Sequence, residues 1–154
     1  MKLKAIVLVL VVLLAGVAVS YAADAEMGTW KLNEAKSKIA PGMPKNHTVV
    51  YAAEGDKIKV TVDGTASDGK PTHNEWTGKF DGKNYPVTGE PSSDMRSYKK
   101  ISAHRLELTA TKGGKVTLTG TVVVSADGKT RTVTVHATDS KGMKTTSTAV
   151  YDKQ

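Results

Sequence analysis

Apolar and polar residues alternate along most of the chain, in ten short segments separated by turns that contain glycine. Within residues 57–63, for example, Ile58, Val60 and Val62 alternate with lysine, threonine and aspartate. A period of two places the apolar side chains on one face of a β-strand and the polar ones on the other. The pattern therefore predicts ten strands, at residues 28–32, 47–53, 57–64, 72–80, 83–88, 95–102, 105–112, 115–125, 130–139 and 143–153.

The segments between these strands have the composition of tight turns. Asp-Gly-Lys occurs at 68–70, 81–83 and 127–129, and Gly-Gly-Lys occurs at 113–115. Glycine and aspartate tolerate the positive φ of hairpin turns, so strands that follow each other in sequence should be antiparallel neighbours. Residues 33–46 form a longer connector with room for one helical turn.

A meander of ten strands with one apolar face predicts a closed sheet. An open sheet would leave that face and two edges uncovered, and closure removes both faults. We therefore expect an all-β fold, a closed antiparallel up-and-down β-barrel of eight to ten strands. A β-sandwich would bury the same residues and is the alternative fold. The largest side chains expected to face inward are those of Ile58, Val60, Val62, Trp76, Phe80, Leu106, Leu108, Val116, Leu118, Val122, Val124, Val133 and Val135.

The first residues have the pattern of an export signal. Lys2 and Lys4 precede an apolar run at 5–19, and Ser20 and Ala22 place small residues before a cut after Ala22. A cut after Ala25 is the second candidate, and an uncleaved membrane anchor is the alternative. We expect a signal peptide at 1–22 and one barrel domain at 23–154. Because the chain has no cysteine, we expect the bacterial periplasm or the extracellular space as its location, with no stable membrane insertion after cleavage.

Charge and motifs limit the classes of function. The net charge is +7, but the lysines are scattered, whereas nucleic-acid binding needs a basic stripe with exposed aromatic residues. The histidines have no partner at metal-ligand spacing, and no catalytic triad or carboxylate pair is recognisable. We therefore expect no enzymatic activity, metal, cofactor or nucleic-acid partner, and no pattern points to a particular protein partner. The four histidines are His47, His73, His104 and His136.

Both ends of the predicted domain resemble one superfamily. The segment Gly-Thr-Trp-Lys-Leu at 28–32 resembles the Gly-x-Trp start of the calycins, which include lipocalins and fatty-acid-binding proteins. Residues 147–153 are similar to the last strand of fatty-acid-binding proteins, although their Arg-x-Tyr appears here as Ala149-Val150-Tyr151. More narrowly, the chain resembles small exported bacterial proteins described as lipocalin-like. The resemblance implies a calycin-like barrel that binds a small, largely apolar or amphipathic molecule non-covalently in its interior. It also implies that Trp30 lies at the closed end and that Arg131 takes the role of the late arginine that packs over it.

The residues themselves suggest where a ligand would bind. Trp76 and Phe80 lie four apart on one predicted strand face, and Gly78 between them leaves room near the backbone. Arg131 is two residues before Val133 and four before Val135, so it should point inward with these valines. An inward arginine at the rim would be a natural anchor for an anionic group. Arg96 shares a face with Tyr98 in the same way. The candidate ligand-binding residues are Trp30, Trp76, Phe80, Tyr98, Arg131 and Tyr151. In the competing interpretation these are core residues of a side-chain-filled barrel, and the protein has a structural or interaction role.

Overall fold

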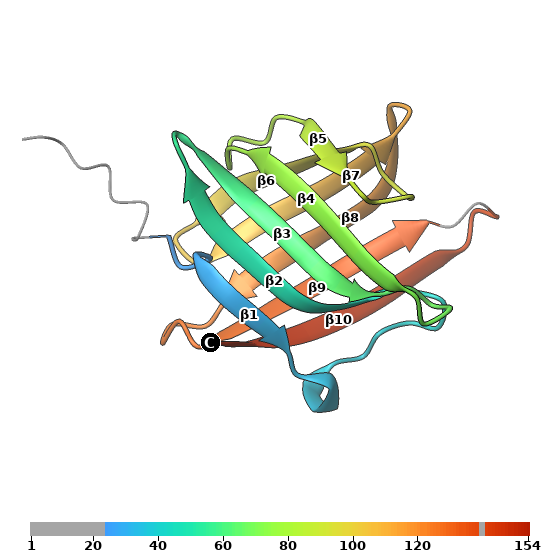
Figure 1. The fold of residues 1–154 in the computed structure, drawn as a ribbon, viewed down its shortest axis with the longest axis horizontal. Helices are drawn as coiled ribbons and strands as arrows, with labels where there is room; N and C mark the ends of the chain where they lie inside the picture. Colours follow the sequence, from blue (N-terminus) through green and yellow to red (C-terminus); the bar gives the residue numbers. More distant parts are fainter. Residues whose placement is uncertain (1–23, 139–140) are drawn as a thin grey trace, which may run out of the picture.

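The computed structural model describes residues 24–138 and 141–154; the predicted signal peptide lies outside the described residues. Ten antiparallel strands form a closed barrel in the order β1-β10-β9-β8-β7-β6-β5-β4-β3-β2 (Figure 1). The predicted fold class is confirmed, and the alternative of a β-sandwich is wrong because the first strand pairs with the last. Among the described residues, none of the helical structure is long and apolar enough to cross a membrane.

The strands agree with the predicted set, with differences at their ends. β2 starts at Lys45 rather than at residue 47, and β4 ends before Phe80. β5 is the shortest strand, with four residues. The strands are β1 (Gly28–Leu32), β2 (Lys45–Glu54), β3 (Lys57–Thr65), β4 (Pro71–Gly78), β5 (Tyr85–Thr88), β6 (Met95–Ser102), β7 (Arg105–Lys112), β8 (Lys115–Val124), β9 (Thr130–Thr138) and β10 (Lys144–Lys153).

The connector between β1 and β2 contains the one helical turn that its length predicts. This turn is the 3-10 helix η2 (Glu34–Lys36), whose backbone is capped by the Asn33 side chain, which accepts a hydrogen bond from the Lys36 amide at 3.2 Å. Beyond it, Lys38 forms a bridge with Thr148 of β10. The connector therefore continues the pairing of β1 with β10 before it turns back into β2.

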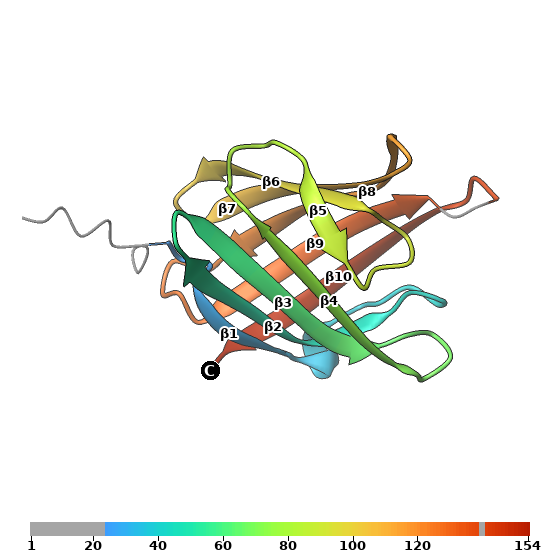
Figure 2. The same cartoon turned by 45° about the horizontal axis from the view of Figure 1, so that its top comes forward.

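The barrel has two unlike ends (Figure 2). We call one end the base; it carries the turns β2–β3, β6–β7 and β8–β9, together with residues 24–27. We call the other end the mouth; it carries the turns β3–β4 and β7–β8, the connector after β1 and the loop before β6. This alternation follows from an antiparallel meander, in which each successive turn lies at the opposite end.

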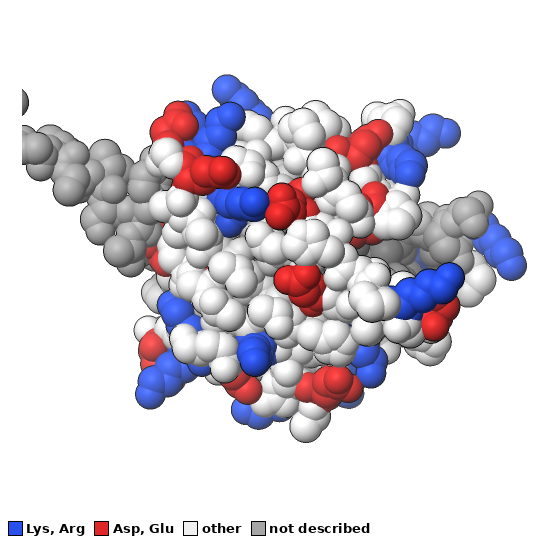
Figure 3. All heavy atoms as spheres, viewed as in Figure 1, with Lys and Arg blue, Asp and Glu red and all other residues white. Residues whose placement is uncertain are grey.

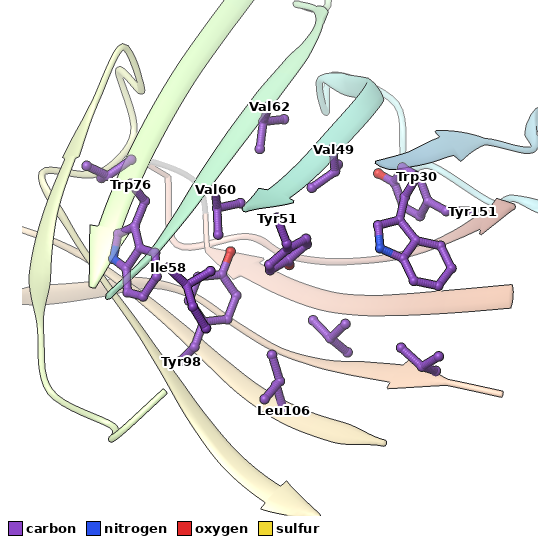
Figure 4. Close-up of a cluster of buried hydrophobic side chains, with 13 residues drawn as sticks. Trp30, Val49, Tyr51, Ile58, Val60, Val62, Trp76, Tyr98, Leu106 and Tyr151 are labelled. Atoms are coloured by element: carbon purple, nitrogen blue, oxygen red, sulfur yellow. The ribbon is translucent and has the colours of Figure 1, made fainter. Parts of the chain in front are cut away.

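A cluster of buried side chains fills the barrel from the base to its middle (Figure 4). Trp30 and Val60 have no measurable exposure, and Trp76 is 1% exposed. Val133 and Ala149, which are cross-strand partners on β9 and β10, are only partly buried where they pack against it. The cluster consists of Trp30, Val49, Tyr51, Ile58, Val60, Val62, Trp76, Val87, Tyr98, Leu106, Val122, Val124 and Tyr151.

Val116 is the clear error among the predicted inward residues. It is 57% exposed, because the ladder between β7 and β8 shifts: Ala110 pairs with Leu118, and the next pair is Thr111 with Val116. Thr117 is thus an extra residue on β8. Such a bulge reverses the alternation beyond it, so that Val116 faces outward although Leu118 faces inward.

Candidate functional site in the barrel interior

Trp30 closes the base of the barrel. Its indole Nε1 donates a hydrogen bond of 2.8 Å to the backbone carbonyl oxygen of Glu26, in the short segment that precedes β1. The cation above the indole belongs to Lys153 of β10, whose Nζ lies 5.2 Å from the ring centroid. The prediction that Arg131 packs over Trp30 is therefore wrong. The register of β1 against β10 pairs Trp30 with Lys153, which explains why Lys153 rather than Arg131 covers the indole.

Arg131 lies between two tyrosines inside the barrel. Its guanidinium carbon is 5.1 Å from the ring centroid of Tyr51 and 5.0 Å from that of Tyr151. Its Nη2 donates a hydrogen bond of 2.6 Å to the Tyr51 hydroxyl. Arg131 does face inward, but it is 4% exposed and lies at the base, because β9 starts there. The predicted position at an open rim is wrong.

Glu26 supplies the charge that compensates Arg131. One carboxylate oxygen, Oε2, lies 3.5 Å from Arg131 Nε, and both side chains are 4% exposed. Burial raises the pKa of Glu26 to about 6, and the opposing effect of the Arg131 charge does not cancel that rise. Burial also raises the pKa of Tyr51. Because a buried ion pair already neutralises this guanidinium, Arg131 is a poor anchor for an external anion.

The aromatic candidates form one cluster in the middle of the barrel. Trp76 stacks on Phe80 with 6.5 Å between ring centroids, and it meets Tyr98 edge-on at 4.8 Å. Tyr51 joins this cluster to the Arg131 pair through edge contacts with Phe80 and Tyr98. Tyr51 was not among the predicted ligand-binding residues, although it lies on the same strand face as the buried Val49.

Gly78 does not leave space for a ligand. A Cβ atom placed there would lie 2.6 Å from the ring of Trp76 and 2.6 Å from that of Tyr85. The aromatic rings themselves therefore occupy the room that the glycine provides. Together with the cluster above, this contact means that the predicted aromatic wall is a packed core.

The inner wall near the mouth has a different character. Leu118 of β8 and Val135 of β9 face inward, because Leu118 pairs with the buried Ala110 and Val135 pairs with Gly120 on the inward row of β8. Both are only partly buried, and neither packs against the core cluster. The mouth thus presents inward-facing apolar side chains that solvent reaches.

A second inward arginine lies at this end. Arg96 of β6 is 9% exposed, and its Nη2 donates a hydrogen bond of 3.3 Å to Oδ1 of Asn74, which is 5% exposed on β4. The backbone carbonyl of Arg96 accepts a hydrogen bond of 2.8 Å from the indole of Trp76. The strand face that Arg96 shares with Tyr98 predicted that Arg96 points inward. It did not exclude the alternative that an arginine so close to the start of a strand extends its side chain into solvent.

The surface of the described residues has shallow hollows and scattered charges. Two surface hollows have volumes of about 200 Å³ each, one beside η2 and one at the base beside Phe80. Both are below the roughly 300 Å³ at which ligand pockets begin. Lysines, arginines and acidic residues are interspersed over the face seen in Figure 3. Within residues 24–138 and 141–154, no cluster of histidine and acidic residues has an arrangement that could hold a metal ion.

Comparisons with known proteins find likeness only among solved structures. No family model matches the chain, and no curated protein matches it. A redesigned β-barrel, mFAP1, bound to DFHBI is 18% identical, with a TM-score of 0.46 over 87% of this chain and 100% of that one. Another barrel bound to DFHBI, EF1p2_mFAP2b, is 13% identical with a TM-score of 0.49 over 86% and 97% of the two chains. Apocrustacyanin C1 is 12% identical with a TM-score of 0.45, over 85% of this chain and 62% of its own. At these identities and scores the likeness is confined to barrel architecture.

Proposed function

We propose that this protein is exported and binds a small, largely apolar molecule through the inner wall at its mouth. The supporting observation is that Leu118 and Val135 are apolar, face inward and yet remain partly exposed. A barrel filled completely by its own side chains would bury them and gain about 25 cal/mol for each Å² removed from water. An apolar ligand at the mouth would supply that burial instead.

This proposal moves the ligand away from most of the residues that the sequence suggested. Trp76, Phe80 and Tyr98 contact one another, and Arg131 is paired with Glu26. These contacts favour a side-chain-filled base, as the competing interpretation expects, whereas inward apolar side chains at the mouth remain partly exposed. The proposed location in the periplasm or outside the cell depends on the signal pattern at 1–22.

A pair of variants on one strand tests the binding wall. Leu118→Lys places a charge on the inward face, whereas Val116→Lys places the same charge on the outward face two residues away. The probe is N-phenylnaphthylamine, a neutral apolar fluorophore whose emission rises on leaving water. We expect wild type and Val116→Lys to bind it alike and Leu118→Lys to bind it at least about tenfold more weakly.

Equal fluorescence titrations for the two lysine variants would contradict binding at the mouth. Native mass spectrometry of the protein extracted from its own host gives an independent test. A co-purified small molecule supports the proposal, and a bare polypeptide mass under gentle conditions argues for the filled barrel.

A further inference from the structure

We infer that Arg96 and Asn74 anchor the anionic head group, such as a carboxylate, of the molecule that the mouth binds. The ligand class would then be an amphipathic anion rather than a neutral apolar compound. This inference rests on the proposed function, because it assigns the polar end of the same ligand.

The two inward arginines differ in whether an acidic side chain compensates their charge. Arg131 has Glu26 as its counter-ion at 3.5 Å. Arg96 is more than nine-tenths buried, and the one hydrogen bond that its guanidinium donates within the described chain goes to the neutral amide of Asn74 at 3.3 Å. No acidic side chain of residues 24–138 and 141–154 forms an ion pair with it. A buried cation without a counter-ion is costly, and an anion that binds there regains part of that free energy.

The two arginines also differ in their access to solvent. In Arg131, Nε and Nη1 are buried and have no hydrogen-bond partner among the described residues, so nothing from outside reaches them. No atom of Arg96 is buried and unpaired in this way. Its remaining N–H groups are therefore partly exposed to solvent, so a carboxylate can reach them. A guanidinium presents its donors in a planar fork that matches the two oxygens of such a group.

Arg96 also lies within reach of the apolar side chains at the mouth. Arg96 pairs with Ala110 of β7, and Ala110 pairs with Leu118 of β8. Neighbouring strands are about 4.8 Å apart, so Leu118 lies roughly 10 Å from Arg96 along the wall. A short alkyl or aromatic tail spans that distance, with the small Ala110 side chain beneath it.

A matched pair of ligands tests the anchor. Decanoate and decanol have the same chain length and differ in the charge of the head group. Against the wild-type protein, we expect decanoate to displace N-phenylnaphthylamine about tenfold more effectively than decanol does. In Arg96→Gln this preference should disappear, while the affinity for the neutral fluorophore stays the same. Arg105→Gln, at an exposed position of β7, is the charge-matched control and should keep the preference.

A second variant covers the case in which Arg96→Gln does not fold. Asn74→Asp gives Arg96 an internal carboxylate of nearly the same shape, which should stabilise the fold and remove the preference for decanoate. Equal displacement by decanoate and decanol in the wild type would overturn the inference, as would a preference that survives both variants. If the fluorophore binds and only the preference is absent, the proposed function stands without the anionic anchor.

Discussion

Arg131 and Tyr151 are cross-strand partners on β9 and β10, with the guanidinium carbon 5.0 Å from the tyrosine ring centroid. Ala149, two residues before Tyr151 on β10, provides no cation for this tyrosine. The neighbouring strand supplies one, at the position opposite Tyr151. The same cation is bonded to Tyr51 and paired with Glu26, so its contacts within the protein are those of a structural group at the base.

The buried Glu26 carboxyl should make stability depend on pH. Its pKa is about 6 in the folded protein against 4.5 without burial, so between these values the folded state binds more protons than the unfolded state. The contribution of Glu26 to the free energy of unfolding should therefore fall by about 2 kcal/mol in total as the pH rises from well below 4.5 to well above 6, with most of the fall between these two values. Urea unfolding of wild type and Glu26→Gln across this range measures the effect. Parallel pH profiles for the two proteins would mean that Glu26 titrates normally.

Removing the other member of the pair should be more damaging. Arg131→Met leaves Glu26 buried without its counter-ion and leaves the Tyr51 hydroxyl without its donor. We expect a loss of about 3–5 kcal/mol at neutral pH, much of it restored in the double variant Arg131→Met with Glu26→Gln. The free energies of unfolding of the wild type, the two single variants and the double variant, measured with denaturant, form a double-mutant cycle that tests this. Losses that simply add in the double variant would show that the two side chains act independently.

Trp30 should be the most costly side chain to truncate at the base. It is fully buried, its indole donates to the Glu26 carbonyl, and Lys153 covers its ring. We expect Trp30→Ala to lower the free energy of unfolding by about 3–5 kcal/mol. Ile101→Ala, at a position that is 46% exposed, serves as a control with a change within about 0.5 kcal/mol. A melting temperature of Trp30→Ala equal to that of the wild type would remove Trp30 from its role in closing the base.

Alternation along the chain was enough to predict the strands and their closure, because each strand has one apolar face and each turn is short. It failed where a single residue changes the register. Val116 has the parity of Leu118, and only the bulge at Thr117, which depends on the pairing with β7, turns it outward. A local pattern gives no sign of such a pairing shift.

The candidate site was less predictable than the fold, for a related reason. Parity gives the face of a side chain but not the groups that cover it. The inward direction of Arg131 followed from its strand, whereas its pairing with Glu26 depends on a segment before β1 that has no periodic pattern. In the same way, Lys153 rather than Arg131 lies over Trp30 because of the β1–β10 register. The difference between a compensated and an uncompensated arginine appears only in three dimensions.

The shortness of β5 has a consequence for how molecules enter. Two register pairs join it to β4 and two join it to β6, and one of its four residues is Pro86, which has no amide hydrogen to donate. A segment held by so few bonds separates from its neighbours at lower free-energy cost than the long ladders around it, so its amides should be among the first in the wall to exchange with deuterium. Asn74 and Arg96 belong to the two strands on either side. Transient separation of β5 from its neighbours would thus open the barrel wall next to Asn74 and Arg96.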